Sequence, residues 1–502
     1  MVISEDRLSE FDQQWNKHKI ILLRSPPASG KTIFLERLEL YSKKKKGRVV
    51  RRISMTAVER MEAKSIDDFW KEVAGEPWSS FRTCTVPTDI LIDEAQTFYG
   101  KANFFWRDIK GLVDHANPNL RVLLSMCSYR ARGDDHYPHN IHDVPYELGL
   151  NCLRLKWIEF DQLVEHFINF VHKADHFELT IPMTVRDVIF NITAGHPHIV
   201  RKTLEILKDH FRHTDFKDSD MLNYLSSHEY YFAIKDLHVF DALRNLEMTN
   251  DNIEFLRNAY HHVDSDSTFP FDGIDDPTFY GTDKFQRSGL ITNAHGGLRM
   301  QFAVPLMRGI SGIKLFTTPI STQLPTQSAD SFDAFLLLTF ERMRPSILRK
   351  SLSRTGQMGS RLMERQWQME WLTASRTAGP IDSLIIPVAG AVCGLPGHLD
   401  FYIGGKLRWG VEIITEGIES ANHIAHLASG GRYINIPMNH WAIIDFRHHS
   451  AEPEELKSDV WYAMYADDYK TITVQRQGHE DKVIRLCGDW DSSPIALVGH
   501  VF

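Results

Sequence analysis

The strongest constraint on this 502-residue chain is a short loop between an apolar segment and an amphipathic one. Residues 25–32 read SPPASGKT and follow the apolar run KIILLRS. The loop is close to the P-loop pattern G-x-x-x-x-G-K-[ST], in which backbone N–H groups and a helix start wrap phosphates. We expect Lys31 to reach the β and γ phosphates and the Thr32 hydroxyl to ligate Mg²⁺. The remaining nucleotide-binding residues predicted here are Ser25, Ala28, Ser29 and Gly30.

This loop departs from the pattern at its first position, where Ser25 replaces glycine. The tight turn must then form from Ser-Pro-Pro, in which Pro26 and Pro27 each hold φ near −65°. The prolines either stiffen the loop or distort it. Gly30 keeps the close approach of backbone to phosphate, because glycine has no Cβ.

A second motif supports the same chemistry. The apolar run Ile90-Leu-Ile is followed by Asp93 and Glu94. A parallel strand delivers side chains at its carboxyl end, where ligands bind in open α/β sheets. We predict that Asp93 holds Mg²⁺ and that Glu94 orients or deprotonates the attacking water. Ser125 or Ser128, at the end of the next apolar run, is a candidate contact for the γ-phosphate, and the predicted cofactors are ATP and Mg²⁺.

Apolar strands alternate with amphipathic helices over residues 1–150, which predicts a parallel sheet. Residues 151–230 have helical periodicity. In 231–315 a helical stretch precedes two short strands around a Gly-rich tip, the order of a winged helix. The fold class expected is a multidomain α/β protein. Its predicted segments are a P-loop NTPase domain (1–150), a helical lid (151–230), a winged-helix-like domain (231–315), a Ser/Thr/Pro-rich linker (316–332) and a C-terminal α/β domain (333–502).

Composition restricts partners and location. The net charge of −8 gives no global basic field, so a nucleic-acid site has to be a local patch. The run Lys43–Lys46, with three arginines following, predicts either such a patch, a nuclear-localisation signal or a solvated helix end. Five scattered cysteines without C-x-x-C spacing indicate free thiols in a reducing compartment. No apolar run has the length of a membrane span, so we expect an intracellular chain in cytoplasm or nucleus. The alternative is a chain that is secreted into a host nucleus and from which a leader has been removed.

Ala194-Gly195-His196-Pro197 precedes the helical segment HIVRKTLEIL. It is similar to the Gly-x-Pro motif of the signal-transduction ATPases with numerous domains (STAND), a branch of the AAA+ class. The resemblance implies that Gly195 and Pro197 shape a helical lid that faces the nucleotide, and that His196 or Arg201 approaches the phosphates. The alternative is an ordinary helix N-terminus with proline in its first turn.

The C-terminal third carries ERQWQMEW (364–371), GHLDFYI (397–403), LRWGVEII (407–414), Gly417, His423 and Gly431-Arg-Tyr433. This order resembles the restriction-endonuclease-like domain of Crinkler-type effectors of fungi and oomycetes, in which a P-loop ATPase with a winged helix precedes the nuclease-like domain. The resemblance covers nearly the whole chain and implies Mg²⁺-dependent cleavage of DNA.

In such a nuclease, carboxylates from a helix and two strands gather one or two Mg²⁺ ions. The predicted metal ligands are Asp400 and Glu412, joined by a hairpin over Gly404-Gly405, with Glu370 or Glu364 from the preceding helix. The usual Glu-x-Lys lysine is replaced by Ile414, so its role is vacant unless Lys406 or Arg432 takes it.

Three functions therefore remain open. In the first, ATP binding and hydrolysis switch a nuclease-like domain that acts on DNA. In the second, the chain is a catalytically inactive effector or scaffold, in which ATP is a conformational switch and the last domain only binds DNA, a host protein or another copy in a homo-oligomer. A third reading is an ATPase of nucleic-acid defence or of a mobile element.

Overall fold

The computed structural model describes most of the chain in segments. The described residues are 3–55, 65–98, 109, 111–112, 117–126, 146–175, 177–212, 216–244, 249, 252–253, 255–256, 259, 268–270, 285, 289–294, 299–316, 329–354, 364–379, 385–387, 399–404, 407–417, 420–427, 436 and 438–488. They form two compact units. The N-terminal unit contains residues 1–179, 193–205 and 236–308, and the C-terminal unit contains 180–192, 206–235 and 309–502.

A parallel five-stranded sheet forms the centre of the N-terminal unit, with the strand order β2-β3-β4-β1-β5. The four apolar runs of the sequence are strands, and the predicted parallel sheet is confirmed. The bounds are β1 Ile20–Arg24, β2 Val49–Ser54, β3 Thr88–Asp93, β4 Leu120–Met126 and β5 Glu147–Leu148.

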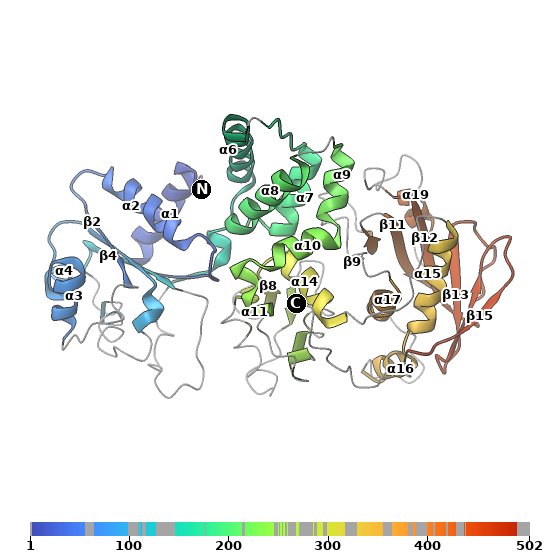
Figure 1. The fold of residues 1–502 in the computed structure, drawn as a ribbon. Coiled ribbons are helices and arrows are strands. Elements are labelled where there is room, and N and C mark those ends of the chain that lie inside the picture. Colours follow the sequence, from blue (N-terminus) through green and yellow to red (C-terminus); the bar gives the residue numbers. More distant parts are fainter. Residues whose placement is uncertain are drawn as a thin grey trace. The chain divides into compact units, whose positions relative to one another are not determined.

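Helices cover both faces of this sheet, because successive side chains of a strand point to opposite sides. Ile21 and Leu23 pack against α1 (Glu5–His18) and α2 (Lys31–Lys43). Ile20 and Leu22 pack in a second core with α3 (Ile66–Ala74) and α4 (Trp78–Arg82). Figure 1 shows α1 and α2 together over one side of the blue sheet. All five positions of β1 are buried, as two covered faces require.

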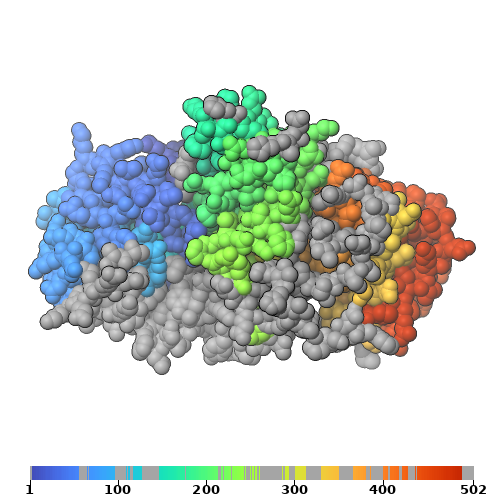
Figure 2. Space-filling view, in the orientation of Figure 1, coloured from blue at the N-terminus to red at the C-terminus, as the bar shows by residue number. Residues whose placement is uncertain are grey.

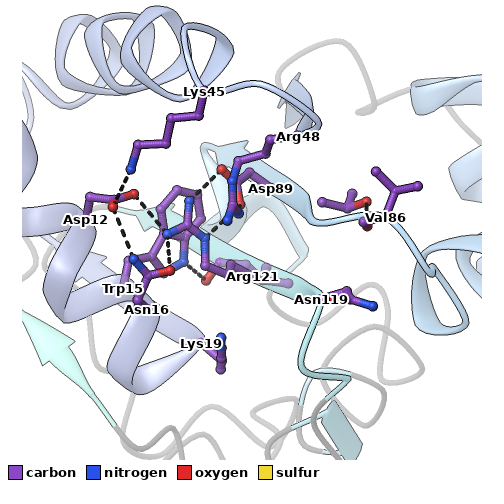
Figure 3. Close-up of polar contacts among 12 residues, drawn as sticks. Asp12, Trp15, Asn16, Lys19, Lys45, Arg48, Val86, Asp89, Asn119 and Arg121 are labelled. Carbon is purple, nitrogen blue, oxygen red and sulfur yellow. Dashed lines mark hydrogen bonds and ion pairs between the residues drawn. The ribbon is translucent and has the colours of Figure 1, made fainter.

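A buried ionic network ties α1 to the amino ends of β3 and β4 (Figure 3). Arg121 donates to both oxygens of Asp89 at 2.7 and 2.6 Å and to Asp12 at 2.9 Å. Its guanidinium carbon lies 4.3 Å from the ring centre of Trp15, and Arg48 also pairs with Asp89. The network lies at the end of the strands opposite to the one that Lys31 and Asp93 occupy.

The basic run after α2 is largely neutralised by acids of the same unit. Lys43 pairs with Glu39, Lys44 with Glu5 and Lys45 with Asp12, and the following arginines pair likewise: Arg48 with Asp89, Arg51 with Glu76, and Arg52 with Glu36 and Glu39. These ion pairs favour the interpretation of the run as a solvated helix end and weaken that of a free basic patch.

Residues 151–230 are helical as predicted, and their described part contains no strand. The elements after β5 are η4 Leu150–Cys152, α6 Trp157–Asp175, α7 Met183–Thr193, α8 Pro197–Phe211, α9 Asp218–Leu225, α10 His228–Lys235, η5 His238–Phe240 and α11 Asp241–Arg244. A small antiparallel sheet follows in the order β6-β8-β7, formed by β6 Thr268–Pro270, β7 Ile291–Ala294 and β8 Arg299–Phe302. The β7–β8 pair matches the two expected strands, but of residues 271–288 before them only Phe285 is described, so the winged helix stays a prediction.

The C-terminal unit contains three helices before its sheet. They are α15 Ala329–Arg342, α16 Pro345–Arg354 and α17 Glu364–Ala378, after α14 Pro305–Phe316. Pro345 begins α16 because proline lacks the N–H that a continuing helix needs but fits a first turn. Because α15 begins at Ala329, the last residues of the predicted linker 316–332 are helical.

A seven-stranded mixed sheet packs against α15 and α17, in the order β15-β14-β13-β12-β11-β10-β9. Only β11, β12 and β13 run parallel to one another. Trp367 and Trp371 of α17 are fully buried, and the ring centres of Trp367 and Phe446 lie 4.2 Å apart in a stacked arrangement. Strands β14 and β15, red in Figure 2, reach the surface. The bounds are β9 Ile385–Pro387, β10 Phe401–Ile403, β11 Trp409–Thr415, α19 Ser420–Leu427, β12 His440–His448, β13 Val460–Tyr465, β14 Thr471–Gln475 and β15 Lys482–Arg485.

No helix in the described part of the chain is long and apolar enough to cross a bilayer.

The described cysteines, Cys84, Cys152 and Cys487, are free thiols, in line with the scattered pattern in the sequence. Burial raises the pKa of the Cys152 thiol to about 11, so this thiol stays protonated at neutral pH.

Candidate functional site

The loop 25–30 connects the carboxyl end of β1 to the first turn of α2. Ala28 and Gly30 have φ of 59° and 93°, the left-handed region that glycine adopts at least cost. The Ser25 N–H donates to the Met126 carbonyl at 3.1 Å, which ties the loop to the end of β4. The loop with Ser-Pro-Pro in place of a first glycine therefore still delivers Lys31 as the first residue of the helix.

Lys31 is buried and turns back over its own loop. Its Nζ donates to the Ser25 and Pro26 carbonyls, both at 2.9 Å. The side chains of Ser25 and Ser29 are also buried, and their hydroxyls have no hydrogen-bond partner among the described residues. A buried hydroxyl without a partner is costly, so this loop has polar capacity left for a ligand.

Thr32, Asp93 and Ser125 meet at the carboxyl ends of the central strands. The Thr32 hydroxyl donates to Asp93 Oδ2 at 2.8 Å, and the Ser125 hydroxyl donates to Asp93 Oδ1 at 3.1 Å. Asp93 is 3% exposed. One hydroxyl and one carboxylate at the end of a P-loop are hard oxygen donors of the kind Mg²⁺ binds, with waters and phosphates completing its shell. The residues thus fit a magnesium-bound nucleotide.

Glu94 directly follows this cluster in a strained conformation. Its φ of 58° is left-handed, and its side chain accepts a hydrogen bond from Gln96 in the short helix η2 (Ala95–Phe98). Non-glycine residues in this region cost roughly 1–3 kcal/mol and cluster at active sites. Asp93 and Glu94 have different hydrogen-bond partners, Thr32 and Ser125 for the first and Gln96 for the second, which suits two carboxylates with separate roles. Ser128, the alternative to Ser125, lies outside the described residues.

The segment 193–197 forms the boundary between α7 and α8. Ala194 and Gly195 are both left-handed, with φ of 46° and 66°, and Pro197 is the first residue of α8. His196 is 0% exposed, and neither ring nitrogen has a hydrogen-bond partner among the described residues. Burial lowers the pKa of His196 to about 3, helped by the positive charges of His198, Arg154 and Lys31. His196 is therefore a neutral imidazole whose surroundings include the P-loop lysine.

Arg201 does not share this position. Its side chain is 71% exposed and pairs with Glu205 one turn further along α8 at 2.9 Å. Of the two residues that the lid resemblance proposed for phosphate contact, the structure brings only His196 towards Lys31. The arginine whose charge acts on His196 is Arg154, which the sequence analysis missed because no motif surrounds it.

Asp400 and Glu412 face each other on neighbouring strands of the C-terminal unit. The antiparallel register pairs Phe401 with Val411, so continuing it by one residue sets Asp400 opposite Glu412. Burial and then the charge of Glu412 raise the pKa of Asp400 well above its ordinary value. Glu412 is 1% exposed, and its two carboxylate oxygens have no hydrogen-bond partner among the described residues. Opposed like charges on adjacent strands are destabilising unless a proton or a cation lies between them. The predicted hairpin that joins these residues is confirmed.

The helix carboxylate linked to this pair is Glu364, and the link runs through a glutamine. Gln368 of α17 donates to Glu364 Oε1 at 3.0 Å and to Asp400 Oδ1 at 3.1 Å, bridging the two acids. Glu370 lies elsewhere on the helix: both its oxygens bind Arg344, at 3.0 and 2.9 Å. The two glutamates are six residues apart, which at 100° per residue is about 240° around the helix. Glu370 is thus a structural ion-pair partner, and Glu364 takes the place proposed for it.

The position of the missing lysine is occupied by a buried Ile414. Lys406 and Arg432 lie outside the described residues. His423 of α19 approaches the site instead, with Nδ1 3.3 Å from Glu412 Oε2. In the part of the chain that the structure describes, no three His, Cys, Asp or Glu side chains converge closely enough to hold a metal by themselves. Two carboxylates with water and a substrate phosphate are nevertheless a common Mg²⁺ environment.

Comparisons with known proteins place this geometry in context. No protein-family model and no curated protein matches the chain. Among solved structures, a Walker-type ATPase of Pyrococcus abyssi matches with TM-score 0.39 and 10% identity, over 62% of this chain and 96% of that one. Drosophila ORC bound to DNA matches with TM-score 0.29 and 9% identity, over 63% and 100%. AMPPCP-bound DnaA from Aquifex aeolicus matches with TM-score 0.28 and 15% identity, over 53% and 82%. At TM-scores this low, the interpretation of the site rests on its own geometry.

Proposed function

We propose that the N-terminal unit binds ATP with Mg²⁺ at the loop 25–32 and hydrolyses it. The observation that carries the proposal is the contact of Thr32 and Asp93 at 2.8 Å beside a buried Lys31, at the carboxyl ends of parallel strands. Short-range sequence motifs do not by themselves bring these residues together, because Thr32 and Asp93 come from different strand–loop units. Their meeting supports a site built for a metal-bound triphosphate.

Each residue has a separate task. Lys31 exchanges its two carbonyl contacts for phosphate oxygens, which need its positive charge more than neutral carbonyls do. Thr32 and Asp93 hold Mg²⁺, which neutralises charge that develops on the transferred phosphoryl group. Glu94 orients the attacking water and accepts its proton. Gly195, neutral His196 and Pro197 form the lid side of the site.

Two variants test this assignment. Lys31→Ala should abolish the thermal stabilisation that Mg-ATP gives the wild type, and Glu94→Gln should retain it while losing hydrolysis. Lys43→Ala is the matched control, because Lys43 is an exposed lysine of the same helix in a surface pair with Glu39. Equal stabilisation of wild type and Lys31→Ala would rule out the P-loop assignment, and wild-type turnover by Glu94→Gln would remove Glu94 from the mechanism.

For the C-terminal unit we propose an Mg²⁺-dependent DNA nuclease site of Asp400, Glu412 and Glu364. Support comes from the two opposed carboxylates and from the burial of Glu412, which is 1% exposed and has His423 Nδ1 at 3.3 Å. Mg²⁺ bound there would activate a water for attack and neutralise charge on the scissile phosphate. Asp400 and Glu412 would hold the ion, and Gln368 would keep Glu364 and Asp400 aligned. The full arrangement proposed is a Crinkler-type effector with STAND-like lid, winged helix, linker and nuclease-like domain, acting in cytoplasm or nucleus.

A second function is favoured by the buried Ile414 in place of lysine and by the lack of a third converging ligand among the described residues. In that function the last domain binds DNA or a protein partner without cutting, and ATP acts as a switch. Nicking of supercoiled plasmid with Mg²⁺, with and without ATP, separates the two. Cleavage by the wild type but not by Asp400→Ala/Glu412→Ala supports the nuclease. Protein that binds ATP but never cleaves supports the scaffold, and equal cleavage by both proteins places the activity outside this site.

A further inference from the structure

Arg154 lies at the junction between the first sheet and the lid helices. It follows the turn η4 and precedes α6, and the N–H of the next residue, Leu155, donates to the Gly195 carbonyl at 2.8 Å. This contact sets residue 154 beside His196. All residues of this neighbourhood, including Lys31, belong to the N-terminal unit.

The guanidinium of Arg154 has no acidic partner in the part of the chain that the structure describes. Burial lowers the pKa of Arg154, and no described acidic group opposes this effect. Nη2 donates to the Ala303 carbonyl at 2.8 Å, while Nε is shielded from solvent and has no hydrogen-bond partner among the described residues. A neutral carbonyl positions the group without neutralising it. Arg154 as a whole is partly buried, and a partly buried cation without a counter-ion gains when a ligand supplies the opposite charge.

The polar groups near Arg154 are the His196 ring and the Lys31 ammonium. Both ring nitrogens of the fully buried His196 lack partners in the described part of the chain. The charges of Arg154 and Lys31 both act on this imidazole. Hydrogen bonds also connect Arg154 to the phosphate loop, because its partner Ala303 donates its N–H to the Leu290 carbonyl at 2.9 Å. The adjacent Gly289 packs against the loop so closely that a Cβ there would lie 2.7 Å from Pro26 Cβ. An anion with several oxygen acceptors could accept from Arg154, from Lys31 and from the single N–H of the neutral His196, as a phosphate does.

We propose that Arg154 is a second phosphate-binding cation of the nucleotide site, acting together with Lys31. This inference rests on the proposed binding of ATP at the loop 25–32 and adds a residue that no motif marks. Arginine suits the role, because its planar fork stays charged and can bind two phosphate oxygens side by side. The Ala303 carbonyl holds one arm of the fork and leaves the other donors for the ligand.

The test compares stability without ligand and affinity for ligand in Arg154→Met, using the non-hydrolysable analogue AMPPCP with Mg²⁺ in calorimetric titration. Hydrogen bonds to charged groups predict a rise in Kd of about 10- to 100-fold. The melting temperature without nucleotide should stay unchanged or rise, because an uncompensated charge is replaced by an apolar side chain of similar length. Arg154→Lys, which keeps charge but loses the fork, should raise Kd less than Arg154→Met. Arg51→Met, at an exposed pair with Glu76, is the matched control and should behave as wild type.

The outcomes separate this proposal from the one it rests on. If Arg154→Met melts several degrees lower but binds AMPPCP within twofold of wild type, Arg154 is a structural tie to Ala303 and the proposal is wrong. If wild type binds no AMPPCP at all, the nucleotide site itself is wrong, together with this extension. If Arg154→Met does not fold, Arg154→Lys gives the answer. A folded Arg154→Lys that binds AMPPCP with wild-type affinity would show that the arginine fork does not hold two phosphate oxygens, and the proposal would be wrong.

Discussion

Replacing Arg121 with methionine should destabilise the N-terminal unit without touching the nucleotide site. Arg121 is 1% exposed and holds Asp89 through two bonds and Asp12 through one. Methionine fills similar volume but leaves both carboxylates short of a partner. Breaking a buried ion pair from one side costs about 3–5 kcal/mol. Arg48 still pairs with Asp89 and Lys45 with Asp12, so we expect the lower end, about 3 kcal/mol.

For a unit of this size, about 3 kcal/mol corresponds to a fall in melting temperature of roughly 6–12 °C. The assay is urea unfolding followed by fluorescence, with thermal melting as a second measure. Arg51→Met is the matched control: it removes an arginine paired with Glu76 at 3.1 Å, where both side chains are more than 40% exposed. Exposed pairs contribute about 0–1 kcal/mol, so the control should be nearly silent.

The same variant has a pH signature. Burial alone would raise the pKa of Asp12, but the hydrogen bonds and charges of Lys45 and Arg121 together lower it. A carboxyl whose folded pKa is lowered stabilises the fold above its unfolded pKa and loses that contribution as pH falls through the folded pKa. The difference between wild type and Arg121→Met should therefore shrink in acid. A loss no larger than that of Arg51→Met at pH 7, or one independent of pH, would refute a stabilising role for the network.

Three further outcomes are expected. Gly30→Ala should cost about 1–3 kcal/mol and weaken ATP binding, because alanine is strained at φ 93°; thermal melts with and without Mg-ATP check this. Glu412→Gln should raise the stability of the metal-free protein at pH 7 and abolish any Mg²⁺-induced shift in melting temperature, because the neutral side chain no longer opposes Asp400 and the raised pKa of Asp400 falls. Thermal melts across pH, with and without MgCl₂, measure both effects. A variant less stable than wild type would contradict the charge argument. Neutralising Lys43–Lys46 should leave DNA affinity in band-shift assays unchanged, because three of the four lysines are paired within the unit, and a marked loss would restore the basic-patch interpretation.

Much of the N-terminal fold was predictable, because its signals are local. Apolar runs with turn residues between them indicated β1 to β4, and parallel strands necessarily deliver Asp93 and Ser125 to the edge where the loop after β1 also lies. The hairpin that sets Asp400 opposite Glu412 was likewise readable, from two short apolar runs around a glycine pair. The winged helix and the segment boundaries stay predictions.

What only the tertiary structure decided is which distant side chains meet. Periodicity places Glu364 and Glu370 on one helix, but the rotation of α17 against the sheet sends the first to Asp400 and the second to Arg344. Arg201 has the motif and faces solvent, whereas Arg154 has none and lies beside His196. In the sequence, the basic run at the end of α2 resembles a free basic patch. In the structure, acidic residues of α1, α2 and β3 neutralise most of its charges. Sequence by itself determined the elements and the chemistry at their ends, because those depend on neighbours along the chain. Long-range packing chose the partners of each charge, because that choice depends on how whole elements are rotated and paired.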